Sequence, residues 1–119
     1  MGKLTRLMDD GIDRVLGLPV AVLYKHSPSC GASRWAMTEM ERLADDRPET
    51  PIFVVDVIQQ RPLARRLAEM LSVTHASPQV LLLEQGSVVW HGAHSNVRAE
   101  FVEEQLDRLL PDGPRADPA

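Results

Sequence analysis

The sequence predicts an α/β fold, in which helices cover both faces of a four-stranded mixed sheet in a single domain. Along the 119 residues, segments with apolar side chains at helical spacing alternate with short apolar runs rich in valine, isoleucine and leucine. The last two of these runs are separated only by Gln85-Gly86, which is typical of a β-hairpin. A chain of this length, with 44% hydrophobic residues, can bury the core of one domain.

The N-terminal part of the chain is expected to form a helix and then a strand. Over residues 4–16, apolar residues recur at roughly helical spacing, and Gly17 with Pro19 ends the pattern. Residues 20–24 are a short apolar run with two valines, bounded by Pro19 and by polar residues. We therefore expect a buried strand there.

The middle of the chain repeats this alternation. A helix is expected after residue 30, because apolar residues return at helical spacing, and it should end before Pro48. Residues 52–57 predict a second strand, parallel to the first because a helix lies between them. The apolar pattern over residues 63–71 predicts another helix, with Pro62 in its first turn.

The C-terminal part predicts a hairpin and a last helix. Strands over residues 80–84 and 87–91 flank Gln85-Gly86, where glycine tolerates the positive φ of a tight turn. Apolar residues over 97–110 predict an amphipathic helix, which completes one domain over residues 1–110. Residues 111–119 are expected to be a flexible tail. This order of elements is that of a thioredoxin fold, with the hairpin completing the four-stranded sheet.

Charge and hydropathy exclude several classes of protein. The net charge of −4 provides no general attraction for nucleic acid or anionic lipid. No apolar stretch approaches the roughly 20 residues of a transmembrane helix, and residues 1–13 lack the apolar core of a secretory signal. We therefore expect a cytoplasmic protein with no membrane or nucleic-acid partner, and a lone free cysteine suits that reducing compartment.

Cys30 is the only cysteine in the chain. It cannot form a disulfide within the chain, so its covalent sulfur chemistry must join it to a small thiol or to another protein. Because it lies between a strand and the start of a helix, where an anion is stabilised, we expect a reactive thiol with a pKa below the roughly 8.5 of an unperturbed cysteine. The alternative is a small buried hydrophobic residue.

The residues around Cys30 are the first candidates for its site. Ser33 stands where a redox Cys-x-x-Cys motif has its second sulfur; its hydroxyl cannot resolve a disulfide, but it can donate a hydrogen bond to the thiolate. A plain serine on the helix surface is the alternative. His26, when protonated, can lower the pKa of the thiol further. The neighbours Ser29 and Gly31 are candidates for substrate contact.

Three short motifs follow one another along the chain. They are Lys25-His26-Ser27 before the cysteine, His75-Ala76-Ser77-Pro78-Gln79, and Val89-Trp90-His91 after the hairpin turn. With these motifs, from about residue 18 to residue 101, the chain resembles the monothiol bacilliredoxin-like proteins of the YtxJ type. The resemblance implies a cytoplasmic thioredoxin-fold protein of the bacillithiol system, which reverses mixed disulfides between bacillithiol and protein cysteines.

The resemblance also implies a substrate groove. In thioredoxin-like folds a cis-proline precedes the third strand and faces the cysteine, which leaves the preceding backbone free to pair with a bound chain. Ser77-Pro78 occupies the matching position, with His75 and Gln79 nearby. By analogy with glutathione-binding folds, the loop over residues 92–96, including His94, is expected near the cysteine. Its N–H groups can then bind a carboxylate of the thiol.

A metal site at His91 and His94 is not favoured. Zinc requires three or four ligands, and neither a second cysteine nor a tight carboxylate cluster accompanies the two histidines. We expect no metal and no tightly bound cofactor.

Three functions are compatible with these residues. The first is a monothiol thiol-disulfide oxidoreductase that removes bacillithiol from proteins through Cys30, with bacillithiol as co-substrate and with bacillithiolated proteins and a disulfide reductase as partners. The second is a sensor or carrier whose thiol is capped or oxidised under stress. The third is a redox-silent module that holds peptides in the proline groove.

Overall fold

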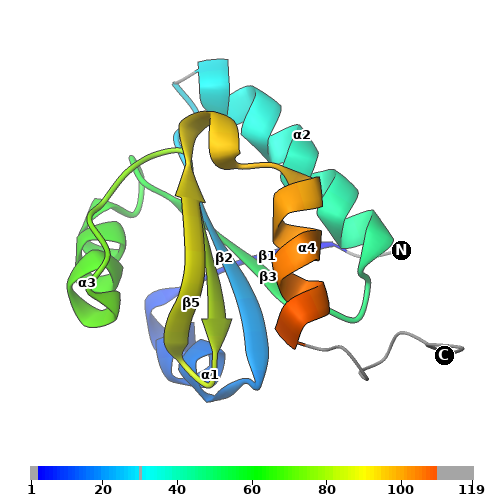
Figure 1. Cartoon of the computed structure of the whole chain (residues 1–119). Coiled ribbons are helices and arrows are strands. Elements are labelled where there is room, and N and C mark those ends of the chain that lie inside the picture. The colour runs from blue at the N-terminus through cyan, green and yellow to red at the C-terminus, as the bar shows by residue number, and fades with distance from the viewer. Residues whose placement is uncertain (1–2, 30, 110–119) are drawn as a thin grey trace, which may run out of the picture.

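The computed structural model describes residues 3–29 and 31–109, which form a five-stranded mixed sheet with helices on both faces (Figure 1). The strands are β1 (Leu4–Arg6), β2 (Val20–His26), β3 (Ile52–Asp56), β4 (Gln79–Glu84) and β5 (Ser87–Ala93). Their order across the sheet is β1-β3-β2-β4-β5. The first three are parallel, β4 is antiparallel to β2, and β5 is antiparallel to β4.

The helices lie where the apolar periodicity predicts them, apart from the N-terminal segment. They are α1 (Ile12–Gly17), α2 (Gly31–Asp46), α3 (Arg61–Leu71) and α4 (Ala99–Leu109), with two short 3-10 turns, η1 (Asp9–Gly11) and η2 (His94–Asn96). Among the described residues, no helix is long and apolar enough to span a membrane. The tail expected over residues 111–119 lies outside the described residues.

Two expectations for the N-terminal segment are wrong. Residues 4–16 do not form one helix, because the chain begins with β1, continues through η1 and becomes helical only at Ile12. β1 pairs with β3, with Leu4 opposite Ile52, so the described sheet has five strands instead of four. Leu4 packs on one face of the sheet, whereas Leu7 and Ile12 are buried on the other. These apolar residues therefore do not form one face of a single helix, although their spacing is roughly helical.

Alternating side chains on the strands build one core on each face of the sheet. The first core, under α1 and α3, contains the buried residues Leu7, Ile12, Val15, Ala21, Leu23, Phe53, Val55, Leu63, Ala64, Leu67, Val73, Leu81 and Leu83. The second, under α2 and α4, contains Val22, Tyr24, Ala36, Met40, Leu43, Ala44, Ile52, Val80, Leu82, Val97, Ala99, Val102 and Leu106. Figure 1 shows α3 on one side of the sheet, and α2 with α4 on the other.

The central strand β2 is two residues longer than the apolar run predicts. Lys25 pairs with Gln79 of β4, and His26 pairs with Asp56 of β3. Both residues therefore belong to the sheet and not to the segment that leads away from it. Strand alternation points them to opposite faces, with Lys25 on the face of Leu23.

The hairpin turn has the predicted position and backbone. Gln85 and Gly86 have φ angles of 53° and 82°, the left-handed values of a tight hairpin turn. A Cβ at Gly86 would lie 2.7 Å from the carbonyl oxygen of Leu16, so the turn also requires glycine because the preceding helix approaches its backbone closely.

Charged side chains join α2 to α4. The Glu39 carboxylate accepts a 2.9 Å hydrogen bond from the N–H of Ala99, the first residue of α4. Just beyond the other end of α2, the Arg47 guanidinium donates to Glu103 at 3.1 Å and to Asp107 at 2.6 Å. The two helices are thus connected at both ends of their contact.

The Arg47 bridge can be tested by substitution. Arg47→Ala should lower the free energy of unfolding by about 1–3 kcal/mol, because two charge-assisted hydrogen bonds with little exposure of the arginine are lost. Arg108→Ala is the matched control, since the exposed Arg108–Glu104 pair should contribute no more than about 0.5 kcal/mol. Urea unfolding measures both, and equal losses in the two variants would contradict the bridge's contribution.

Candidate active site

The polar residues predicted for the site gather at one edge of the sheet, where β2 and β3 end and β4 begins. From that edge, residues 27–30 lead directly from β2 into α2. Cys30 itself lies outside the described residues. Its two neighbours, Ser29 and Gly31, are both exposed, as a substrate-contact role requires.

Ser33 is buried and connects the start of α2 to the end of β2. Its hydroxyl oxygen accepts a 3.2 Å hydrogen bond from the N–H of Ser27, and its carbonyl oxygen accepts a 3.1 Å bond from the Tyr24 hydroxyl. The alternative of a plain serine on the helix surface is therefore excluded. Because Ser33 accepts from Ser27, its own hydroxyl hydrogen is still available for donation.

Tyr24 also determines the protonation pattern of His26. The phenol oxygen lies 2.9 Å from Nδ1 of His26. A phenol has one hydrogen, and Tyr24 donates it to the Ser33 carbonyl, so Nδ1 of His26 must donate to Tyr24 and carry the proton. The neutral imidazole then has its unprotonated nitrogen at Nε2.

Burial lowers the pKa of His26 from its ordinary value of 6.5, and the nearby charge of Asp56 opposes this shift in part. The neutral imidazole is therefore favoured at neutral pH. A charged His26 can assist thiolate formation only under more acidic conditions, which limits the electrostatic role expected from the sequence.

Lys25 is a buried cation on the opposite face of β2, and the sequence reasoning assigned it no site role. Its side chain is 0% exposed, and Nζ lies 3.4 Å from Nδ1 of His75. Burial lowers the pKa of Lys25 from 10.5 to about 8. A lysine at an alternating position of a central strand is the signal that could have predicted this burial.

Ser77-Pro78 is a cis peptide immediately before β4, as the resemblance implies. Pro78 is buried and Ser77 half-buried, while His75 is exposed. Gln79 is buried as the first residue of β4, and its amide donates to the Thr74 carbonyl at 3.1 Å, which closes the loop before the proline.

His94 is joined to the proline through its backbone. With a φ of 57°, it donates its N–H to the Pro78 carbonyl at 2.9 Å, so the loop over residues 92–96 lies beside the cis-proline. Its imidazole is exposed. Among the described residues, His, Asp and Glu side chains form no group of three that could hold a metal.

The backbone N–H groups that lead into α4 have partners within the protein. The N–H groups of Val97 and Arg98 donate to the carbonyls of His94 and Asn96. That of Ala99 donates to the buried Glu39 carboxylate. Since these three N–H groups have partners within the protein, they are not available to a carboxylate of the thiol. Carboxylate binding by the loop over residues 92–96 stays a prediction.

Comparison with known families adds to this geometry. The profile of the monothiol bacilliredoxin BrxC family matches residues 14–102. The chain belongs to this family. The matched range includes Cys30, Ser33, the cis-proline segment and His94, so it covers every candidate site residue that the sequence predicts.

Solved structures similar to this bacilliredoxin family member have the thioredoxin fold. A protein described as having a thioredoxin fold aligns with a TM-score of 0.79 and 23% identity, covering 85% of this chain and 91% of its own. Thioredoxin from Trypanosoma brucei brucei aligns with a TM-score of 0.77 and 13% identity, covering 93% and 94%. The short form of spinach chloroplast thioredoxin f aligns with a TM-score of 0.72 and 21% identity, covering 91% of this chain and 94% of its own. The predicted fold is thereby confirmed.

The Tyr24–His26 hydrogen bond predicts a specific histidine tautomer. In ¹⁵N NMR spectra above its pKa, His26 should be protonated at Nδ1, and Tyr24→Phe should shift it toward the Nε2–H form because the acceptor is removed. Ser33→Ala is the matched control, since it preserves the phenol and the carbonyl that it contacts. An Nε2–H tautomer in the unmodified protein would contradict the assigned direction of the bond.

Buried Lys25 predicts a pH-dependent stability. Its pKa of about 8 in the folded protein is below the 10.5 of an exposed lysine, so the unfolded chain binds more protons between these values and stability rises with pH there. Relative to the unmodified protein, Lys25→Met should be most stabilising at pH 7. That advantage should fall by roughly 2–3 kcal/mol toward pH 10.5.

Urea unfolding at several pH values measures this difference. Lys3→Met is the matched control, because Lys3 is exposed and its removal should not change the pH dependence. Parallel stability profiles for Lys25→Met and the unmodified protein would show that the folded and unfolded pKa values of Lys25 do not differ.

Proposed function

We propose that this protein is a cytoplasmic monothiol oxidoreductase that removes bacillithiol from protein mixed disulfides through Cys30. The observation that carries the proposal is a single cysteine within the segment matched by the bacilliredoxin family, immediately before α2 in the sequence. The residue three positions later, Ser33, has an oxygen that makes a structural hydrogen bond and cannot form a second disulfide.

The first step is a thiol–disulfide exchange. The Cys30 thiolate attacks the bacillithiol sulfur of the mixed disulfide, a new bond forms between these two sulfurs, and the old sulfur–sulfur bond breaks. The client cysteine leaves as a thiolate and takes up a proton from water. The client is reduced, and Cys30 carries the bacillithiol.

The second step restores the enzyme. A second bacillithiol, as a thiolate, attacks the sulfur of the bound bacillithiol, which releases the Cys30 thiolate and bacillithiol disulfide. A disulfide reductase then has to reduce that product at the expense of its own electron donor. Because the chain has one cysteine, it has no internal thiol with which to resolve the intermediate.

The described residues support this chemistry by positioning its parts. Tyr24 and Ser33 hold the first turn of α2 against the end of β2, on the two sides of Cys30 in the sequence. The buried cis-proline, held by His94 through its carbonyl, forms an ordered backbone beside which a client chain can bind.

Transfer of the adduct tests the proposal. Purified protein is mixed with a bacillithiolated client, and mass spectrometry follows the loss of the adduct from the client and its appearance on Cys30. Cys30→Ser should abolish transfer. Ser33→Ala should retain it within about fivefold, because the hydroxyl exchanges no electrons and the loss of one hydrogen bond costs only about 1 kcal/mol.

The other functions would give different results. Capping of Cys30 by bacillithiol disulfide without release of any client would overturn the proposal in favour of a sensor. Absence of any adduct on Cys30, in a protein shown by circular dichroism to be folded, would favour a redox-silent binding module. The rate of Cys30 alkylation, measured against pH, should have its midpoint below the pKa of roughly 8.5 of an unperturbed thiol.

A further inference from the structure

A cationic cavity lies on the α3 side of the sheet, and the proposed reaction has not used it. Its volume is about 270 Å³, and its lining is Val57, Ile58, Arg61, Ala64, Arg65 and His75. The two arginines are four residues apart in α3, so they lie on the same face of that helix. The histidine comes from the loop before the cis-proline. Two elements thus contribute nitrogen donors to one space.

The charge of this cavity is not neutralised by the protein. Within residues 3–29 and 31–109, neither Arg61 nor Arg65 forms an ion pair or a side-chain hydrogen bond. No acidic residue lines the cavity. The nearby Asp56 carboxylate accepts hydrogen bonds from the backbone N–H groups of Ile58 and Gln59. The arginines therefore remain available to an external anion.

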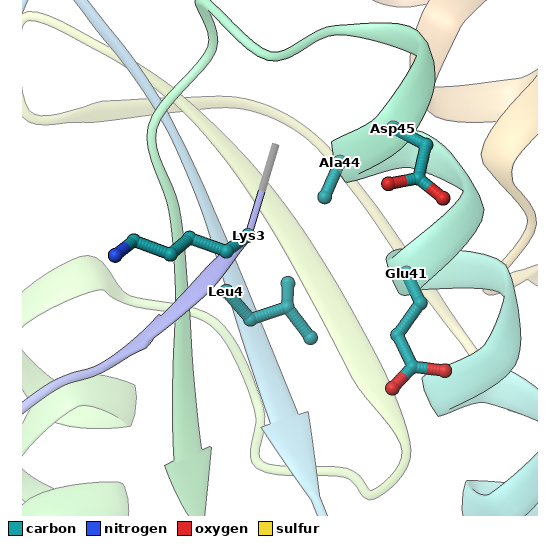
Figure 2. A pocket seen from close by; sticks show the side chains of 5 residues that line it. All are labelled: Lys3, Leu4, Glu41, Ala44 and Asp45. Carbon is teal, nitrogen blue, oxygen red and sulfur yellow. The ribbon is translucent and has the colours of Figure 1, made fainter. Parts of the chain in front are cut away.

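Three other cavities of the described structure are lined by at least one acidic residue. The largest, about 490 Å³ between β1 and α2, has the carboxylates of Glu41 and Asp45 on one wall and Lys3 at the other side (Figure 2). Glu41 also lines a cavity with Arg34, and Glu104 lines one beside Trp90. Each contains a carboxylate that opposes anion binding, so the cavity of Arg61 and Arg65 is distinguished by its charge.

Lys25 adds to the positive field from behind His75. Its Nζ lies 3.4 Å from Nδ1 of the histidine. Burial, followed by the charges of Lys25 and Arg65, lowers the pKa of His75. The imidazole is therefore mainly neutral at neutral pH and serves as a hydrogen-bonding group, while the arginines carry the charge.

The cavity is also next to the segment that carries the thiol. Val57, in its wall, donates its N–H to the carbonyl of His26 at 2.9 Å, and His26 is four residues before Cys30. His75 is three residues before the cis-proline. In contrast, the start of α4 already holds the Glu39 carboxylate. The cationic cavity therefore lies on the α3 side of the sheet, beside the end of β2.

We propose that Arg61, Arg65 and His75 bind a carboxylate of the low-molecular-weight thiol that Cys30 receives from its client. This inference rests on the proposed function. It adds that these three side chains make the protein select a thiol with a carboxylate over an uncharged thiol. The two guanidinium groups and the imidazole donate hydrogen bonds to the carboxylate oxygens. No bond to this carboxylate forms or breaks during exchange, so its binding positions the thiol.

A binding experiment tests the cavity without sulfur chemistry. The full-length Cys30→Ser variant is titrated with malate, a dicarboxylate that contains no sulfur, and calorimetry measures the affinity while NMR follows the His75 imidazole. Adding Arg61→Gln or Arg65→Gln should weaken binding by about tenfold each. Arg66→Gln, the matched control from the same helix, should leave the affinity unchanged because Arg66 does not line the cavity.

An exchange experiment then tests the thiol selection. The same client is capped either with bacillithiol or with 2-mercaptoethanol, which has no carboxylate. Arg61→Gln and Arg65→Gln in the Cys30 protein should slow removal of bacillithiol by about tenfold each and leave removal of 2-mercaptoethanol unchanged. Arg66→Gln should alter neither rate.

Several results would overturn the inference. In the binding experiment, they are equal malate affinity in all variants and the absence of a malate-dependent change at His75. In the exchange experiment, it is equal slowing of both capped clients, which would place an acidic group of the client in the cavity. These results are independent of the proposed function. Malate binding uses a protein without a thiol, and adduct transfer to Cys30 can succeed even when the arginine variants show no selectivity.

Discussion

The pairing of β2 on both of its edges is the constraint on which the rest of the structure depends. β2 is parallel to β3 and antiparallel to β4, and both ladders extend to its last residues, Lys25 and His26. A one-residue slip of β2 would break both ladders and move Tyr24 and Lys25 to the opposite faces of the sheet. The end of β2, and with it the start of the thiol-bearing segment, is therefore fixed by the sheet.

Alternation along this strand divides the polar groups of the site between two faces. Tyr24 points toward α2, where its hydroxyl connects His26 to the carbonyl of Ser33. Lys25 points the other way, toward His75. One face therefore holds the groups that order the first turn of α2, and the other holds Lys25 and the cations of the cavity beside α3. The backbone geometry of a strand separates the two tasks.

The polar groups near the thiol illustrate how a one-cysteine protein differs from a dithiol. The buried oxygen of Ser33 receives a backbone hydrogen bond, so the position of a second redox sulfur is used for structure. The start of α4 is likewise occupied by Glu39, which joins two helices. The oxygen of Ser33 and the N–H of Ala99 are therefore engaged in contacts within the protein, whose chain has one cysteine.

The amino-acid sequence was sufficient to predict the alternation of elements after residue 17, the hairpin at Gln85-Gly86, the position of the cis-proline through the family resemblance, and a lone cysteine. The elements, the hairpin and the lone cysteine follow from local periodicity, turn chemistry and composition, which a single segment contains, whereas the cis-proline is what the resemblance implies. Tertiary structure alone decided that Leu4–Arg6 is a strand, since its pairing with β3 joins residues far apart in the sequence. It also decided that Lys25 is buried and that His75 lines the same cavity as Arg61 and Arg65 of α3. Burial and proximity of this kind depend on strands and helices that are far apart in the sequence.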